Sequence, residues 1–511
     1  MSQIISTTFA VMRRTCTLTL CLLLTTLLYS QEKQNFLPVA QMHSDLAILK
    51  SALTSLHPGI YRYLTRSQLD RYFAEIEIQT NKPLSLKDFY IKLSQLTAKL
   101  KCGHTYLNPY NQKKTLTAQL QSGLVIPLLF KVVDKKIIVT HNLSEHAQIK
   151  AGDEVVSING LPTTKIIDSL LTASRSDGNH GLNKKLDNIG ISPYLANKDR
   201  YALFDIYFPL FFTENPCSDY YEIGVKPFKN NEVIRYNFRM ISKQIRQQRY
   251  QDRYEAESIQ PTGTFKLVST QCGYLKIRDF TTKGWEKNYD YYLDSIFNKL
   301  KTIKATQLIV DIRDNEGGDD DVRNKVISYL ITHPAYHTIR RYYRFLEVPD
   351  SLMPYLQTWD QSFKRPKLAS DYVRTNAGLY YKKNTNLVES IIPNQNNFAG
   401  QVYLLTNATN SSSSFFMADI LQENKYAKLA GEATGGTKQG INGGQFFFLY
   451  LPSSGIEVDI PLIYQAPIER RKDEGIRPDI PVKTKASDIA NGIDTQLNYI
   501  IRHLLLSKKP D

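Results

Sequence analysis

The feature that most constrains the fold is an alternation of short apolar strands and amphipathic helices, which begins near residue 264. Buried-strand patterns occur at 306–315 (TQLIVDIRDN) and 401–409 (QVYLLTNAT), and a helical pattern follows each of them. Strands that alternate with helices predict a mainly parallel sheet with helices on its faces. In such sheets, active sites gather at the carboxyl ends of the strands. The sequence therefore predicts an α/β core whose polar strand ends carry the chemistry.

The rest of the chain predicts further domains, because 511 residues are too many for one ordinary domain. Leucines at 46, 49, 53 and 56 share one helix face, and the same style of pattern recurs at 66–78 and 85–100, so a helical domain comes first. The segment 123–143 alternates in short apolar runs around a polar break and reads as a hairpin. The segment 149–171 (IKAGDEVVSINGLPTTKIIDSLL) places a strand, an Asn-Gly turn and a helix in order, and it resembles a PDZ domain.

The first thirty residues have the pattern of a secretory signal peptide. Arg13 and Arg14 precede an apolar stretch, and Ser30 is a small residue at a plausible cleavage site. The apolar stretch is short for a membrane span, although an uncleaved anchor is the alternative. We therefore expect export to the periplasm or the extracellular space, with no membrane span in the mature chain.

Charge and composition exclude several classes of function. The formal net charge is +15, but the basic residues are scattered, which favours a solvated surface over nucleic-acid binding. The nine histidines and five cysteines form no zinc-type or HExxH spacing. We expect no metal and no cofactor.

Two strand ends carry candidate chemistry. After the first, in DIRDNEGGDDD (311–321), Gly317 and Gly318 allow backbone N–H groups to face a cavity and stabilise an oxyanion. After the second, in NATNSSSSFFMAD (407–419), four serines open a helix. One serine is expected to cap that helix. Another would lie at the helix N-terminus, where the partial positive charge and the free N–H groups favour developing negative charge.

These two stretches resemble motifs of the C-terminal-processing (tail-specific) serine peptidases and their tricorn-core relatives. DIRDNEGG resembles the family's "DLRxNxGG", and VYLLTNATNSSSSFFMADIL resembles its strand, "SAxE" and helix. GEATGG, LPSSGIEVDIPL and GIRPDIPV follow in the family's order. The resemblance implies a ClpP/crotonase-like core and places the nucleophile at Ser412, with Ser413 as the alternative. Phe415 then departs from the pattern, because it stands at the family's acidic position.

The resemblance offers two ways to activate the serine. One branch uses a histidine, which KCGHTYL supplies as His104, and an acid before the closing motif, which is Glu469 or, as the alternative, Glu474. The other branch uses a lysine, for which Lys438 is the candidate. We favour the histidine branch, since an imidazole shuttles protons near neutral pH. Backbone N–H groups near Gly317, Gly318 and Ser413 would form the oxyanion hole.

The sequence thus predicts an exported serine peptidase that acts on peptides or proteins, and it leaves the oligomeric state open. One alternative is a Ser–Lys dyad peptidase, and another is a catalytically dead peptide-binding protein of the same fold. The expected division is a signal peptide (1–30), a helical domain with His104 (31–115), a PDZ-like β-rich domain (116–220), a connecting hairpin and linker (221–263) and the α/β peptidase core (264–511).

Overall fold

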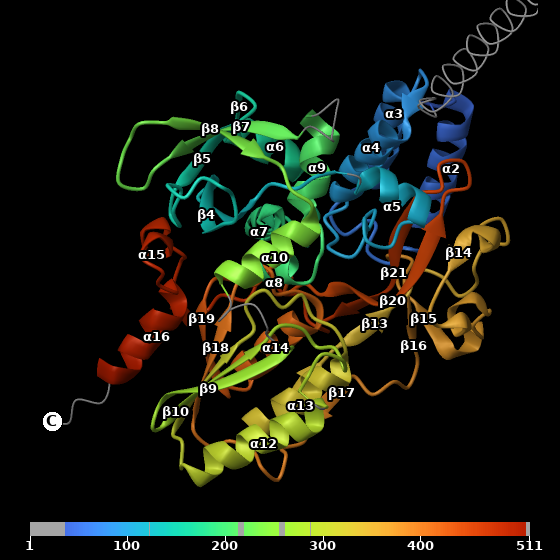
Figure 1. Ribbon diagram of the computed structural model, residues 1–511. Coiled ribbons are helices and arrows are strands. Elements are labelled where there is room, and N and C mark those ends of the chain that lie inside the picture. Colours follow the sequence, from blue (N-terminus) through green and yellow to red (C-terminus); the bar gives the residue numbers. More distant parts are fainter. Residues whose placement is uncertain (1–35, 122, 213–218, 255–260, 287, 507–511) are drawn as a thin grey trace, which may run out of the picture.

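The fold combines helices and several sheets along one chain. The computed structural model describes residues 36–506, apart from 122, 213–218, 255–260 and 287. The predicted signal peptide, residues 1–30, lies outside these described residues. Within the described part, no helix has the length and apolar character needed to cross a membrane. Figure 1 shows N-terminal helices, an antiparallel sheet with its own helices, and an α/β core, so the predicted multidomain α/β class is confirmed.

The leading region is helical, as the leucine spacing predicts. Leu46, Leu49, Leu53 and Leu56 are all fully buried on one face of the first helix. Thr65 begins the second helix with a capping box, and the Ser85 hydroxyl caps the third. The elements are β1 (Phe36–Leu37), α2 (Val39–Leu56), α3 (Arg66–Gln79), β2 (Leu84–Ser85), α4 (Leu86–Ala98) and α5 (Lys114–Leu120).

The core contains a six-stranded sheet in the order β22-β19-β18-β11-β10-β9. Every neighbouring pair in it is parallel except β9 with β10. The strands are β9 (Gly263–Ser269), β10 (Cys272–Ile277), β11 (Gln307–Asp311), β18 (Gln401–Thr406), β19 (Ala427–Gly431) and β22 (Ile480–Pro481). The helices are α12 (Tyr289–Thr302), α13 (Asp320–Leu330), α14 (Ser412–Glu423), α15 (Ala486–Ala490) and α16 (Thr495–Leu506).

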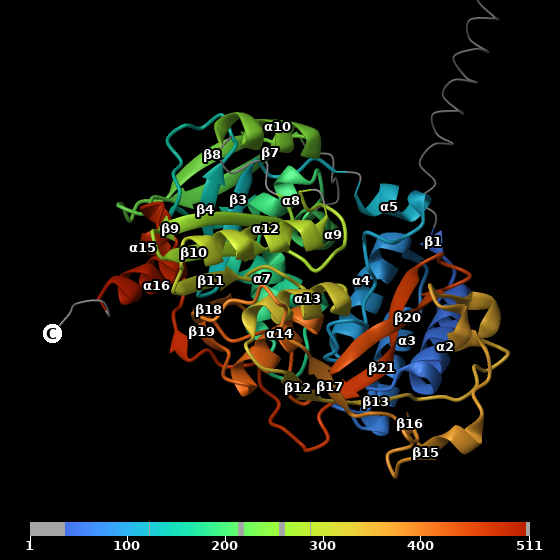
Figure 2. The same cartoon turned by 90° about the horizontal axis from the view of Figure 1, so that it is seen from below.

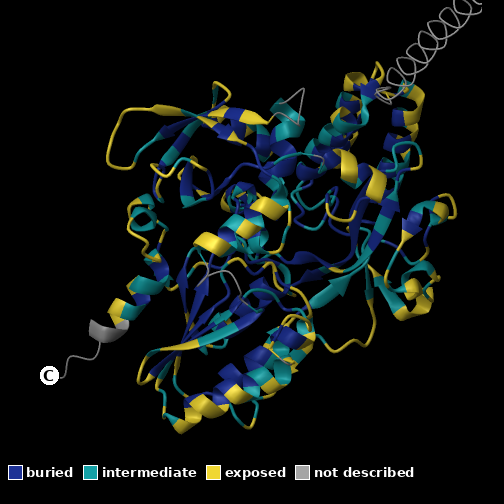
Figure 3. Cartoon of the chain, in the orientation of Figure 1, coloured by how far each residue is buried: buried dark blue, intermediate teal, exposed yellow. Residues whose placement is uncertain are grey.

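Alternate residues of β11 face opposite sides of this sheet, as the pleat of a strand requires. Leu308 and Val310 pack into the cluster that includes α12, α13 and α14. Ile309 packs into a second cluster with Ile500 of α16. Figure 2 shows the core from below, and in Figure 3 the buried strands contrast with exposed positions along α12. The central strands are therefore covered on both faces, which explains their continuous apolar runs.

A long hairpin connects the core to the leading helices. It consists of β20 (Ile441–Tyr450) and β21 (Glu457–Ala466), and most of its buried apolar residues share one hydrophobic cluster with α2 and α4. Figures 1 and 2 both show it leaving the core towards α2. The smaller elements nearby are β12 (Ala335–Thr338), β13 (Arg340–Tyr342), β14 (Leu356–Gln357), β15 (Tyr372–Arg374), β16 (Tyr380–Lys382), β17 (Val388–Ile391) and 3₁₀ turns at Met353–Tyr355, Gln361–Lys364 and Ala369–Asp371.

An antiparallel sheet in the order β3-β4-β5-β7-β8 lies between the leading helices and the core in sequence. Its tight turns at Asp134–Lys135 and Asn159–Gly160 have positive φ at both residues, as two-residue hairpin turns require. The strands are β3 (Leu128–Val133), β4 (Lys136–Asn142), β5 (Glu154–Ile158), β6 (Leu161–Pro162), which pairs with β5, β7 (Tyr220–Lys226) and β8 (Ile234–Arg239). The helices are α6 (Thr163–Ala173), α7 (Leu182–Ile189), α8 (Pro193–Asn197), α9 (Leu203–Phe212) and α10 (Lys243–Arg253).

The stretch expected to be a connecting hairpin and linker (221–263) differs from that expectation. Its hairpin, β7–β8, completes the antiparallel sheet through pairing of β7 with β5. Much of the expected linker is the helix α10, because Arg246 is fully buried and donates two hydrogen bonds to the Asp205 carboxylate at 3.0 and 2.8 Å. This basic stretch is thus anchored by a buried ion pair.

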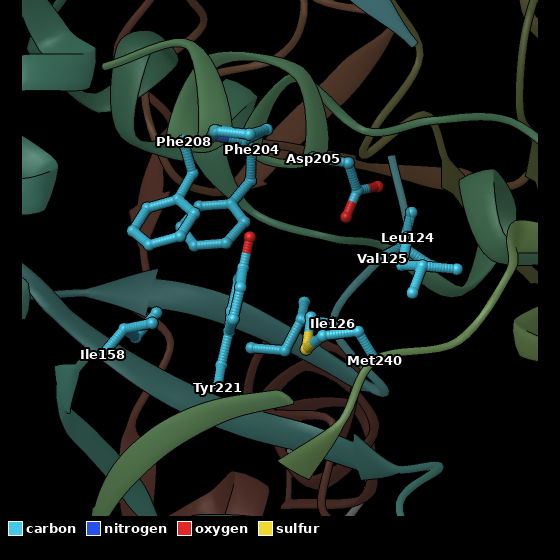
Figure 4. Close-up of a pocket in the computed structure, with 10 residues that line it drawn as sticks. Leu124, Val125, Ile126, Ile158, Phe204, Asp205, Phe208, Tyr221 and Met240 are labelled. Carbon is cyan, nitrogen blue, oxygen red and sulfur yellow. The ribbon is translucent and has the colours of Figure 1, made fainter. Parts of the chain in front are cut away.

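A small apolar pocket lies beside this ion pair (Figure 4). Phe204, Phe208 and Tyr221 form one side of it, and Met240 lies on the other. All four are buried, so the pocket is a feature of the packing between α9 and the antiparallel sheet.

Candidate active site

The polar strand ends of the core meet because β11 and β18 are parallel neighbours, with Asp311 opposite Leu405. Asn410, in the turn after β18, donates from Nδ2 to Ile312 O at 2.6 Å and to Asn315 O at 3.0 Å. Ser414 donates its hydroxyl to Asn315 O at 2.7 Å. The glycine turn and the serine turn are therefore held together by buried hydrogen bonds.

The four serines of the opening turn have different environments. Ser411 and Ser414 form a capping box at the start of α14, and the Ser411 hydroxyl also donates to Asp177 Oδ2 at 2.8 Å. The Ser413 hydroxyl donates to Gly318 O at 2.9 Å and to Asp320. Among the hydrogen bonds of the described residues, none involves the Ser412 hydroxyl. The hydroxyls of three serines thus make described hydrogen bonds, and that of Ser412 makes none.

Ser412 is also set apart by its backbone. It has φ of 54°, which a non-glycine residue adopts at an energetic cost. The side chain is half-buried, so it remains accessible. A strained residue on a sharp strand-to-helix turn is the geometry by which a nucleophilic serine projects from the end of a sheet. The turn therefore presents Ser412 and no other serine in this way.

Backbone amides of two segments surround Ser412. A Cβ on Gly317 would lie 2.9 Å from both Ser412 Cβ and Ser413 N, so glycine is required for this approach. The N–H of Gly317 donates to Asn315 Oδ1 at 2.7 Å. No hydrogen bond is described for the N–H of Gly318 or of Ser413, and the latter lies in the first turn of α14, where N–H groups lack helical partners. The available donors are those of Gly318 and Ser413.

His104 reaches the core from the leading region. Its turn is anchored by Thr105, whose hydroxyl is 2.8 Å from His57 Nε2 in the buried interior. The imidazole lies against β20, where a Cβ on Gly443 would be 3.7 Å from His104 Nε2. The Phe446 ring is also near, with centroids 5.9 Å apart. His104 Nδ1 is buried and has no hydrogen-bond partner.

One carboxylate links the His104 turn with the serine turn. Asp177 accepts a hydrogen bond from Gly103 N–H at 2.8 Å through Oδ1, and from the Ser411 hydroxyl at 2.8 Å through Oδ2. The residues that precede His104 and Ser412 are therefore bound to the same side chain. No hydrogen bond of the described residues joins Ser412 Oγ directly to His104.

Buried charges surround the imidazole. Burial lowers the pKa of His104 to about 4, the charge of Asp177 acts to raise it, and Lys184 and Arg175 act to lower it further. His104 is thus neutral at neutral pH and able to accept a proton. Arg175 donates to Gly103 O at 2.5 Å and to Glu316 Oε2 at 3.2 Å.

Residues 271–482 match the profile of Peptidase family S41. This part of the chain, which is the α/β core, is thus similar to the family S41 peptidases. The match supports serine-type peptidase activity, for which the substrates are peptides or proteins.

Solved structures are similar to nearly the whole chain. Mature CPAF complexed with lactacystin matches 89% of this chain and 95% of that chain, with a TM-score of 0.60 and 14% identity. Mature CPAF alone matches 88% and 94%, with a TM-score of 0.57 and 14% identity. The photosystem II D1 C-terminal processing protease matches 89% and 98%, with a TM-score of 0.41 and 14% identity. The two CPAF structures share the fold of the chain. No curated protein matches the sequence.

The other residues predicted for the site make no described contact with His104 or Ser412. Glu469 is exposed in the loop after β21, and none of the described hydrogen bonds or ion pairs involves it. Lys438 Nζ is 3.7 Å from Glu474 Oε1, so the alternative base and the alternative acid pair with each other. The sequence analysis missed Asp177, and the only local signal is a run of turn-forming residues around it, SDGN.

Proposed function

We propose that the protein is an exported serine peptidase in which Ser412 is the nucleophile and His104 is the general base. The observation that carries the proposal is the Ser412 hydroxyl, which makes no described hydrogen bond and lies on a turn with φ of 54°. Export is supported by the signal-peptide pattern of residues 1–30.

In the proposed reaction, Ser412 Oγ attacks the carbonyl carbon of the scissile peptide bond while His104 takes its proton. The N–H groups of Gly318 and Ser413 receive the oxyanion, and the bare Cα of Gly317 leaves room beside Ser412. The C–N bond then breaks as His104 returns the proton to the leaving amine. Water, deprotonated by His104, hydrolyses the acyl-enzyme and regenerates the serine. This mechanism requires Ser412 Oγ to come within about 2.6–3.2 Å of an imidazole nitrogen.

A fluorophosphonate probe tests the nucleophile on the purified full chain. We expect the probe to label the wild-type protein at Ser412, and Ser412→Ala to abolish both labelling and peptide hydrolysis. Ser413→Ala is the matched control, because its hydroxyl is already bonded to Gly318 O and Asp320. Labelling that is lost in Ser413→Ala and kept in Ser412→Ala would move the nucleophile by one residue.

The same assay decides between the histidine and the lysine as general base. We expect His104→Ala to lower hydrolysis by about 10²–10⁴-fold and Lys438→Ala to leave it within about threefold, because Lys438 pairs with Glu474. A fully active His104→Ala protein together with an inactive Lys438→Ala protein would select the Ser–Lys dyad.

A catalytically dead peptide-binding protein is the second candidate function, and Phe415 is the observation that favours it. This residue stands at the acidic position of the family motif, and its ring is buried against Gly436. A wild-type protein that binds peptide but takes no fluorophosphonate label would favour the catalytically dead peptide-binding protein. We propose that the antiparallel sheet binds a peptide end as an added strand in either case.

A further inference from the structure

One buried carboxylate, that of Asp177, bonds to both halves of the candidate site. Only 2% of this residue is exposed. Its two oxygens accept hydrogen bonds from Gly103 N–H and from the Ser411 hydroxyl, each at 2.8 Å. These donors are the immediate neighbours of His104 and Ser412. Asp177 therefore lies where it can fix the relative position of a base and a nucleophile.

The loop that carries Asp177, between α6 and α7, is held on both flanks. Gly178 N–H donates to Lys101 O at 3.0 Å, and Asn179 N–H donates to Asp473 Oδ2 at 2.9 Å. Arg175, on the other flank, donates to Gly103 O at 2.5 Å. A group that orients a catalytic side chain needs such support from its surroundings. The carboxylate is held in place by backbone and side-chain contacts independent of the serine turn.

The sequence next to His104 leaves space for this carboxylate. A Cβ on Gly103 would lie 2.6 Å from Asp177 Oδ2, which is closer than real contacts allow. Any larger residue at position 103 would displace either the carboxylate or the turn. Glycine at this position and aspartate at 177 are thus fitted to each other.

Charge keeps Asp177 ionised. Burial acts to raise its pKa, but Lys184, His104 and the hydrogen bonds from Gly103 and Ser411 bring the pKa below its usual value. Lys184 Nζ lies 4.0 Å from Asp177 Oδ2, and only 2% of the lysine side chain is exposed. The other nearby carboxylate, Glu316, is half-exposed and bonded to Arg175. Asp177 is the buried anion whose contacts reach both turns.

We infer that Asp177 is the residue that positions His104 and the Ser412 turn in the proposed peptidase reaction, in place of the acid that the family resemblance implied at Glu469. The inference rests on the proposed function. When His104 takes the proton of Ser412, the negative charge of the nearby carboxylate favours the imidazolium. Its bond to Ser411 holds the serine turn in register with the imidazole. The acid of the catalytic group then comes from the region of the antiparallel sheet, outside the S41 core.

The test uses Asp177→Asn in the full chain, because the amide keeps the shape and an acceptor for Gly103 N–H but removes the charge. We expect kcat to fall by about 10²–10⁴-fold, with a smaller change in KM. We also expect the pKa of His104, measured by NMR, to fall below its wild-type value. Gly103→Ala, whose new Cβ would push the carboxylate away, should shift both quantities in the same direction.

Two further variants act as controls. Asp168→Asn on α6, an exposed partner of Lys135, should leave kcat and the His104 pKa unchanged. Asp473→Asn leaves one acceptor oxygen in place of two and so weakens the contacts with Asn179, which loosens the loop without removing the charge beside His104. It should lower activity without moving the His104 pKa. Equal losses in Asp177→Asn and Asp473→Asn, with no pKa shift in either, would reduce Asp177 to a structural residue and overturn the inference.

Failure of the inference can be told from failure of the proposed function. A wild-type protein that takes no fluorophosphonate label and cleaves no peptide contradicts the proposed function. In that event the His104 pKa still reports whether Asp177 acts on the imidazole. Wild-type kcat and an unshifted His104 pKa in a folded Asp177→Asn protein, with active wild type, would contradict the inference alone.

Discussion

The two sides of the candidate site are built in different ways. The nucleophile side consists of two turns that follow neighbouring strands of one sheet, and buried hydrogen bonds from Asn410 and Ser414 join them. The base side combines His57, His104 and Asp177, which belong to three separate segments of the chain. The nucleophile side is therefore local and set by sheet topology, whereas the base side exists only when distant regions pack together.

The chemical character of the two sides differs as well. Around Ser412 the available groups are backbone N–H donors and hydroxyls, whose state does not change with pH in the ordinary range. Around His104 the groups are buried charges, namely Asp177, Lys184 and Arg175. The nucleophile side should thus respond to steric changes, and the base side to pH and to the packing of the regions that compose it.

On the nucleophile side, a steric change is expected to have a large effect on kcat. A Cβ on Gly318 would lie 2.5 Å from Phe280 O, and φ of 138° strains any side chain there. Gly318→Ala should move the proposed oxyanion donor and lower kcat by about 10²–10³-fold. Gly455→Ala is the matched control, because it has φ of 71° with nothing near its Cβ position. Equal values of kcat in the two variants would show that the contact of residue 318 with Phe280 O has no effect on catalysis beyond that of a side chain at positive φ.

The same contrast explains how much could be predicted from sequence. Strand, turn and helix around Ser412 lie within a few residues of one another, so local patterns predicted both polar strand ends and the α/β class. Asp177 is 74 residues from Gly103 and 234 from Ser411, and nothing in its own segment indicates either partner. The family resemblance suggested Glu469 as the acid, and that residue is exposed. Helix α10 was missed for a similar reason, since its buried Arg246 pairs with Asp205 of another helix.

The base side depends on the packing of the antiparallel-sheet region, which contains the buried Arg246–Asp205 pair. Arg246→Met would leave the Asp205 carboxylate buried and unpaired, which destabilises a protein by about 3–5 kcal/mol. We expect this loss in denaturant unfolding monitored in the antiparallel-sheet region. Lys243→Met on the same helix is the control, since its partner Asp199 is partly exposed and the pair is worth about 1 kcal/mol or less. Similar losses of unfolding free energy in both variants would mean that the buried pair contributes no more to stability than the partly exposed one.

Acid should weaken the base side before the core. Burial lowers the pKa of His57 to about 3 and that of His104 to about 4, both below the ordinary 6.5. The unfolded chain therefore binds more protons as the pH falls below 6.5, and the folded state loses stability from there towards pH 3. For His57 alone the loss at pH 4 is about 3 kcal/mol.

In the core, the pKa of Asp311 is instead far below its usual value: burial acts to raise it, but Arg313 and Lys276 outweigh that effect. The contribution of the Asp311 carboxylate to stability is lost only as the pH falls below about 3.8. Unfolding free energies measured against pH should thus fall less steeply between pH 6.5 and 4 in His57→Gln than in the wild-type protein. Parallel curves for the two proteins would contradict the assignment of this acid sensitivity to the base side.

The smallest effect is expected at Glu469. Its side chain is exposed in the loop after β21, whereas the carboxylate that bonds next to both His104 and Ser412 is that of Asp177. An exposed charge acts weakly on a buried imidazole, because solvent and salt screen it. Glu469→Gln should therefore change kcat/KM by less than about threefold, which is below 1 kcal/mol, and leave the pH profile in place. A loss of 10²-fold or more would instead mean that the loop after β21 closes onto His104 during turnover, and the base side would then include a fourth segment supplied by the core.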